Sequence, residues 1–186
     1  MFIVGFTGAA GAGKDTAGLS LVRKLGFQRF AFADPIKYAV AAMLAVPFDK
    51  WLDREWKEAD LDFGAFDITT SPRHLAQTLG TEWGREVIDQ DFWIAVTAYR
   101  VNQAKRNKVV ITDVRFDNEA KWIQASGGWV IEIARPGVQP VRAHESEDGI
   151  NPNLVDFSII NDGSQDLFEL IVAQEIADKM RVRNLL

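Results

Sequence analysis

Short, mainly apolar runs recur along the chain and are separated by stretches with helical spacing. The runs occupy residues 2–6, 30–33, 108–112, 128–134 and 155–160. Such runs, bounded by glycine or polar turns, are typical of strands that are buried on both faces of a parallel sheet. Strands that alternate with helices predict an α/β, three-layer fold with a five-stranded parallel sheet and helices on both faces.

Apolar residues at helical spacing fill most of the segments between the runs. Ala17, Leu21, Val22 and Leu25 lie on one face of a helix that Gly26 ends. Further helices are predicted over residues 35–46, 72–79, 91–105, 118–125 and 164–180. Residues 47–71 break the alternation, because aromatic side chains stand there among acidic ones, and we expect a mobile cap or an insertion.

Length and composition narrow the class of protein. A chain of 186 residues, 47% of them hydrophobic, predicts a single domain over residues 1–186. Cysteine is absent, which excludes disulfides and thiolate metal sites. No apolar run approaches the ~20 residues that span a bilayer, and a net charge of -5 argues against nucleic-acid binding. We expect a cytoplasmic protein with no membrane and no nucleic-acid partner.

The segment from Gly8 to Lys14 fits the phosphate-loop pattern G-x-x-x-x-G-K and lies between a predicted strand and a predicted helix. Small residues at Gly8, Gly11, Ala12 and Gly13 let backbone N–H groups turn toward phosphate oxygens, and the helix N-terminus adds positive potential. Lys14 reaches the outer phosphates. The segment therefore predicts a nucleoside triphosphate site, with ATP as the expected ligand.

One position departs from the usual pattern, in which serine or threonine follows the lysine. Asp15 stands there, and the hydroxyl comes one residue later, at Thr16. We expect Asp15 to bind Mg²⁺ directly or through water and Thr16 to hold the α-phosphate.

The remaining motifs favour a small-molecule kinase. The guanine-reading string N-K-x-D of GTPases is absent, and the strand at 109–112 ends in Asp113 alone rather than in Asp-Glu. A carboxylate beside the phosphate loop repels a triphosphate unless a metal lies between them, so Asp113 is a second candidate for Mg²⁺. Phosphoryl transfer also needs several cations, and arginines occur in the predicted loops at 73, 85, 115, 135 and 142.

Several strings together resemble the bacteriophage deoxynucleoside monophosphate kinases, within the nucleoside monophosphate kinase branch of phosphate-loop proteins. They are GKDT at 13–16, FADPIK at 32–37, RHLAQTLGTEWGR at 73–85, TDVRFDNE at 112–119 and HESE at 144–147. The resemblance implies transfer of the γ-phosphate of ATP to a deoxynucleoside monophosphate, with Mg²⁺. It also implies a helical monophosphate-binding insertion at about 35–90 and a short lid at about 135–153.

The resemblance assigns roles by matching position. Catalytic roles fall to Lys14, Asp113, Arg115 and Arg135, and the carboxylates on the magnesium side are Asp15 and Asp113. The residues expected to hold ATP are Gly8, Gly11, Ala12, Gly13, Lys14, Asp15, Thr16, Arg135, Asn161 and Gly163. The residues expected to hold the monophosphate are Asp34, Lys37, Arg73, Gln77, Thr81, Trp83 and Arg85.

Alternatives stay open for the acceptor and for individual residues. In the first alternative, a dephospho-coenzyme A kinase, the acceptor is a hydroxyl group that needs a general base, and Asp34 could serve as that base. In the second, a regulatory module binds ATP and has no acceptor site. Gln77 and Thr81 also suit a helix that caps its own turn, and Trp83 also suits a core. His144 is expected to hydrogen-bond in the lid, since a phosphate acceptor needs no general base. The aromatic insertion at 51–66 allows a homodimer.

Overall fold

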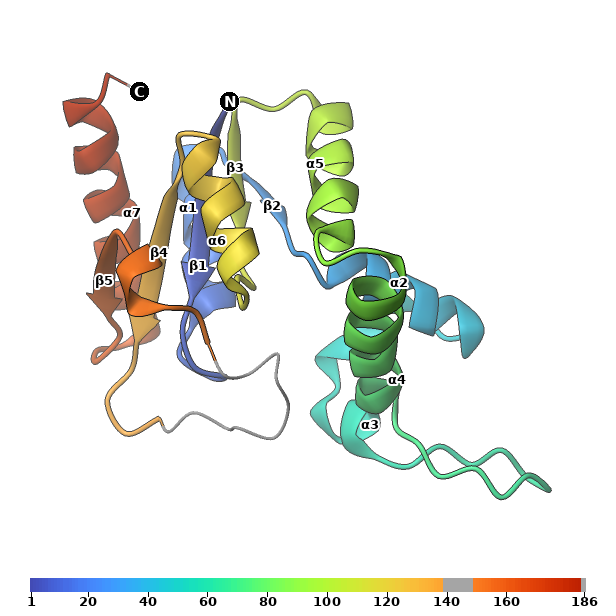
Figure 1. Cartoon of the computed structure of the whole chain (residues 1–186). Helices are drawn as coiled ribbons and strands as arrows, with labels where there is room; N and C mark the ends of the chain where they lie inside the picture. Colours follow the sequence, from blue (N-terminus) through green and yellow to red (C-terminus); the bar gives the residue numbers. More distant parts are fainter. Residues whose placement is uncertain (139–148, 185–186) are drawn as a thin grey trace. The chain divides into compact units, whose positions relative to one another are not determined.

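A computed structural model describes residues 1–138 and 149–184. Five parallel strands form one sheet in the order β2-β3-β1-β4-β5 (Figure 1). The strands are β1 (Phe2–Thr7), β2 (Gln28–Phe30), β3 (Lys108–Ile111), β4 (Trp129–Ala134) and β5 (Phe157–Ile160). Strand β1 is central and pairs with β3 and β4, with Val4 opposite Val110 on one side and Trp129 on the other. The predicted five-stranded parallel sheet is confirmed.

Helices cover both faces of this sheet (Figure 1). On one face, α1 (Lys14–Leu25) and α7 (Gln165–Val182) pack on β1 and β4 through a core that includes Phe6, Leu21 and Phe168. On the other face lies α6 (Asp117–Ala125). Gly5 permits its close approach, because a Cβ there would lie 2.5 Å from the Cδ1 atom of Ile123. Strands β1, β3 and β4 are almost wholly buried, as predicted, whereas the edge strands β2 and β5 are only partly buried.

The described chain divides into two compact units. Unit 1 consists of residues 1–31 and 97–186, and unit 2 of residues 32–96. Unit 1 holds the sheet, α1, α6, α7 and the short 3₁₀ helix η4 (Pro152–Leu154). The prediction of a single domain with an insertion at about 35–90 stays a prediction.

Unit 2 is helical. It comprises α2 (Asp34–Met43), η1 (Phe48–Leu52), α3 (Arg54–Glu58), α4 (Pro72–Thr78) and the π-helix η2 (Leu79–Ile88). It also contains the start of α5 (Phe92–Ala104), whose later residues belong to unit 1.

Several elements differ from the predicted ones, among them α2, which ends at Met43 rather than at residue 46, and β5, which starts at Phe157 rather than at residue 155. Strand β2 ends at Phe30 rather than at residue 33, because Ala31 and Phe32 are buried without joining the sheet ladder. Residues 47–71 contain the two short helices η1 and α3, which were not predicted. The helix predicted to end at Leu79 is followed directly by η2. Within η2, Gly84 leaves room for the Trp93 ring, since a Cβ there would lie 2.3 Å from the Nε1 atom of Trp93.

No helix within residues 1–138 and 149–184 has the length and the apolar content that a membrane span requires.

Candidate nucleotide site

Four loops of unit 1 gather at one edge of the sheet because the strands are parallel. The phosphate loop follows β1, Asp113 follows β3, Arg135 follows β4 and Asn161 follows β5. Ligands of open α/β sheets bind at this carboxyl edge. The topology thus brings together residues that are far apart in the sequence.

The phosphate loop has a conformation that only glycine adopts without strain. Gly8, Gly11 and Gly13 have φ values of 128°, 80° and 110°. At Gly8 a Cβ would also lie 2.3 Å from the carbonyl oxygen of Ile133. The loop therefore fits tightly against β4 before it enters α1, whose N-terminus begins at Lys14.

Lys14 folds back over its own loop. Its Nζ atom donates hydrogen bonds to the carbonyl oxygens of Gly8 at 2.6 Å and Ala9 at 2.8 Å. The ammonium group is thus held above the loop whose backbone N–H groups are candidates for phosphate binding. The role of Lys14 in binding the outer phosphates stays a prediction.

Asn161 ties the last strand to the phosphate loop. Its side chain is buried, and its Nδ2 atom donates a 2.8 Å hydrogen bond to the carbonyl oxygen of Ala12. A Cβ at Gly13 would lie 2.6 Å from the same Nδ2 atom. The hydrogen bond from Asn161 to the loop therefore requires a glycine at position 13.

A cavity of about 400 Å³ opens beside this loop within unit 1. Residues predicted for ATP line much of it, and they are Gly11, Gly13, Lys14, Asp15, Thr16, Arg135, Asn161 and Gly163. Gln165 and Phe168 complete the lining and were not predicted. The cavity is the candidate site for the triphosphate nucleotide.

The two predicted magnesium ligands differ in their surroundings. The side chain of Asp15 is largely exposed, and its Oδ1 atom lies 3.6 Å from a guanidinium nitrogen of Arg29. Asp113 is half-buried after β3. Within the described part of the chain, no group of three or more His, Cys, Asp or Glu side chains could hold a metal ion. Mg²⁺ usually takes one or two carboxylates together with phosphates and water, so these oxygens fit the ion in company with a triphosphate.

A buried carboxylate shapes the turn that follows Asp113. Glu119 in α6 is 2% exposed, and its Oε2 atom accepts hydrogen bonds from the backbone N–H groups of Arg115 at 2.8 Å and Phe116 at 3.2 Å. The carboxylate therefore fixes the backbone on which Asp113 and Arg115 stand. No catalytic or binding role had been predicted for Glu119, although its position four residues after Arg115 suits such a cap.

All seven residues predicted for the acceptor lie in unit 2. Asp34 is buried at the start of α2. Arg73 pairs with Glu58 at 2.8 Å. Burial first, then the charges of Arg73 and Lys37, lowers the pKa of Lys57 below its ordinary value. A bound anion would relieve that repulsion, so Lys57 joins the predicted cations as a candidate that the sequence reading missed.

The π-helix η2 holds three further acceptor candidates. Thr81 and Arg85 are buried, and Arg85 donates a 3.1 Å hydrogen bond to the carbonyl oxygen of Gln90. Trp83 is 43% exposed and lies edge-on to Phe92, with ring centroids 5.6 Å apart. Trp93 is instead buried, and its Nε1 atom donates a 2.7 Å hydrogen bond to the carbonyl oxygen of Gly80. Of the two tryptophans, Trp83 is the more exposed and therefore the better candidate for contact with a base.

The other predicted site residues belong to α4 and to the predicted lid. Gln77 is half-buried in α4. Arg135 is exposed and lines the cavity. Arg142 and His144 lie outside the described residues.

Comparison with known proteins decides the family. A family model described as deoxynucleotide monophosphate kinase matches residues 64–171, which is more than half of the chain. The chain belongs to this family. The predicted family is therefore confirmed. Its reaction class, phosphoryl transfer to a deoxynucleoside monophosphate by a nucleotide kinase, is confirmed with it.

Viral proteins are among the relatives of this deoxynucleotide monophosphate kinase family member. A protein of Acanthamoeba polyphaga mimivirus named "Putative deoxynucleotide monophosphate kinase" is 32% identical over 163 residues, or 79% of this chain and 81% of that protein. The deoxynucleotide monophosphate kinase of Enterobacteria phage T4 is 31% identical over 134 residues, or 64% of this chain and 55% of that protein. The deoxynucleoside-5'-monophosphate kinase of Escherichia phage T5 is 27% identical over 105 residues, or 53% of this chain and 42% of that protein.

Solved structures of other kinases share the fold. Dephospho-CoA kinase from Campylobacter jejuni superposes with a TM-score of 0.52 at 16% identity, over 97% of this chain and 98% of that chain. Shikimate kinase from Aquifex aeolicus gives a TM-score of 0.51 at 15% identity, over 99% of both chains. These likenesses support the phosphate-loop kinase fold. They do not identify the acceptor.

Proposed function

We propose that unit 1 binds Mg-ATP at the phosphate loop and that unit 2 binds a deoxynucleoside 5'-monophosphate, which accepts the γ-phosphoryl group. The observation that supports the donor half most strongly is the cavity beside Gly8–Thr16, with Lys14 and Asn161 bonded to the loop. Lys37, Lys57 and Arg73 support the acceptor half, since three cations interact there within unit 2. The products are ADP and a deoxynucleoside diphosphate.

The reaction needs positioning and charge neutralisation rather than a base. An oxygen of the acceptor's 5'-phosphate attacks the γ-phosphorus, the bond from that phosphorus to the β–γ bridging oxygen breaks, and the bridging oxygen leaves with ADP. The attacking oxygen is already anionic. Lys14, Arg115 and Arg135 would neutralise charge on the transferred group. Asp15 and Asp113 would hold Mg²⁺, which would supply further neutralisation of phosphate charge when bound.

The test is ADP production from Mg-ATP with each of the four deoxynucleoside monophosphates. Dephospho-coenzyme A and a reaction without acceptor serve as controls. We expect at least one monophosphate to accelerate ADP release and to appear as the diphosphate. Acceleration by dephospho-coenzyme A alone would favour a hydroxyl acceptor with Asp34 as base, and ATP binding without any acceleration would favour a regulatory module.

Variants link the activity to the site. Lys14→Ala should lower kcat/KM roughly a hundredfold or more, as loss of a group that stabilises transition-state charge does. Lys24→Ala is the matched control, because Lys24 is an exposed residue in the last turn of the same helix. Equal activity of the two variants would contradict the proposed role of Lys14.

A further inference from the structure

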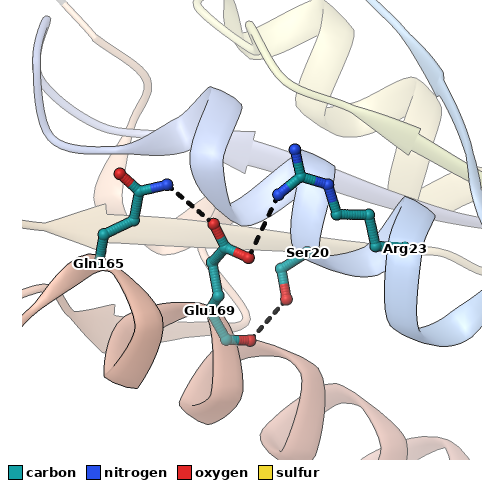
Figure 2. Close-up of polar contacts among 4 residues, drawn as sticks. All are labelled: Ser20, Arg23, Gln165 and Glu169. Atoms are coloured by element: carbon teal, nitrogen blue, oxygen red, sulfur yellow. Dashed lines mark hydrogen bonds and ion pairs between the residues drawn. The ribbon is translucent and has the colours of Figure 1, made fainter.

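Four polar residues join α1 and α7 next to the cavity. Ser20 and Arg23 come from α1, and Gln165 and Glu169 come from α7 (Figure 2). The Ser20 hydroxyl donates a 2.5 Å hydrogen bond to the backbone carbonyl of Glu169. A guanidinium nitrogen of Arg23 lies 3.6 Å from the Glu169 carboxylate, which is largely buried. Glu169 is thus held in place through both its backbone and its side chain.

Glu169 determines which way the amide of Gln165 points. The Nε2 atom of Gln165 donates a 3.0 Å hydrogen bond to the Oε1 atom of Glu169. An ionised carboxylate only accepts hydrogen bonds, so the amide nitrogen, not the amide oxygen, must face it. The amide oxygen of Gln165 consequently points away from Glu169, as Figure 2 shows.

Gln165 lines the same cavity as the phosphate loop. With the phosphates at Gly11–Thr16 and Arg135 beside the transferred group, the lining residues left for the nucleoside are Gly163, Gln165 and Phe168. An oxygen acceptor suits the 6-amino group of adenine, which is a donor. Guanine has a carbonyl oxygen at the same position, and two acceptors face each other unfavourably.

We propose that Gln165, with its amide oriented by Glu169, is a specificity-determining residue that selects ATP over GTP as the phosphoryl donor. Gln165 contacts the base, and Glu169 acts through it as a positioning residue. This inference rests on the proposed ATP site and adds the reason for its base preference. Without Glu169, the side-chain amide of Gln165 would be free to rotate by about 180°. Either its oxygen or its nitrogen would then face the base, and both purines would be bound.

The experiment compares ATP with GTP as donor at a saturating concentration of the accepted monophosphate. The readout is the ratio of the two kcat/KM values, which a general loss of stability does not change. We expect the wild type to favour ATP. Gln165→Ala and Glu169→Gln should each reduce the ratio about tenfold, the size expected for one hydrogen bond to the base.

Glu169→Gln leaves the backbone bond from Ser20 in place and therefore tests orientation with the α1–α7 contact preserved. In the double variant the ratio should be no lower than in Gln165→Ala alone, because Glu169 acts through Gln165. Gln174→Ala, at an exposed position of the same helix, is the matched control and should leave the ratio unchanged.

The outcomes separate this inference from the proposed function. If ATP supports transfer but the wild type shows no preference, or if neither variant changes the ratio, the inference is overturned while the kinase assignment stands. If neither nucleotide supports transfer, the proposed function fails. The inference is then judged by the Kd values of Mg-ATP and Mg-GTP for the same variants, which should shift in the same direction.

Discussion

The side-chain amide of Asn161 donates a 2.8 Å hydrogen bond to the carbonyl oxygen of Ala12 inside the phosphate loop. Asn161→Ala should raise the KM for ATP about tenfold, because the bond is buried and its loss leaves the loop carbonyl unsatisfied. The measurement is steady-state kinetics with varied ATP. Asn102→Ala, at an exposed site in α5, is the control and should behave as the wild type.

Two glycines of the phosphate loop should respond differently to the same substitution. Gly8→Ala combines a φ of 128° with a Cβ position 2.3 Å from the carbonyl oxygen of Ile133. Gly11→Ala has a φ of 80° but nothing within 4 Å of the added Cβ. We expect Gly11→Ala to cost roughly 1 kcal/mol of unfolding free energy and Gly8→Ala clearly more. Urea unfolding measures both, and equal effects would contradict the tight contact at Gly8.

Loss of the Glu119 carboxylate should damage both stability and catalysis. Glu119→Ala removes the acceptor of two backbone N–H groups in a buried position, which should cost about 2–3 kcal/mol of unfolding free energy. Because Arg115 stands on that turn, kcat should fall as well. Glu175→Ala, which removes only a surface pair with Lys179, is the control and should cost well under 1 kcal/mol. A loss of stability without any loss of kcat would contradict a role of Glu119 in positioning Arg115 for catalysis.

Lys57 predicts a pH dependence of stability. Its pKa is lowered in the folded state, first by burial and then by Arg73 and Lys37, so the folded protein releases this proton before the unfolded chain does. The penalty is fully present below the lowered pKa and disappears as the pH rises toward the ordinary value of 10.5. Lys57→Met should therefore gain stability over the wild type at pH 7, and the gain should shrink at pH 10.

Urea unfolding at the two pH values tests this. Lys121→Met, at an exposed position in α6, is the matched control, and its difference from the wild type should not change with pH. A gain for Lys57→Met that is the same at both pH values would contradict the lowered pKa of Lys57 as its cause.

The sheet and the phosphate loop were predictable because their signals are local. Strands that are buried on both faces read as continuous apolar runs, and the G-x-x-x-x-G-K pattern needs only its neighbouring strand and helix. The end of β2 was misplaced since burial continues through Phe32 while the ladder ends at Phe30. Burial and sheet pairing are separate properties, and the hydrophobic pattern reports only burial.

The parts that escaped prediction depend on contacts between distant segments. Gly84 in η2 looks like a helix breaker in the sequence, yet it serves to admit the Trp93 ring. Gln165 carries no signal of its own, and its orientation arises from Glu169 and the packing of α1 on α7. Lys57 became a candidate only when Arg73 and Lys37 were found near it. Lys57 has no motif because its partners lie elsewhere in the chain, and the local pair of Gln165 and Glu169 becomes visible only through the contact of Glu169 with α1.

The bond between Asn161 and Ala12 spans 149 residues, and this separation has a consequence for synthesis. A nascent chain leaves the ribosome N-terminus first, so the glycine loop emerges well before β5, which completes it. At about 5–20 residues per second, the interval lasts several seconds or more. The nucleotide can therefore meet the completed loop, and act through it as a folding ligand, only after β5 has emerged.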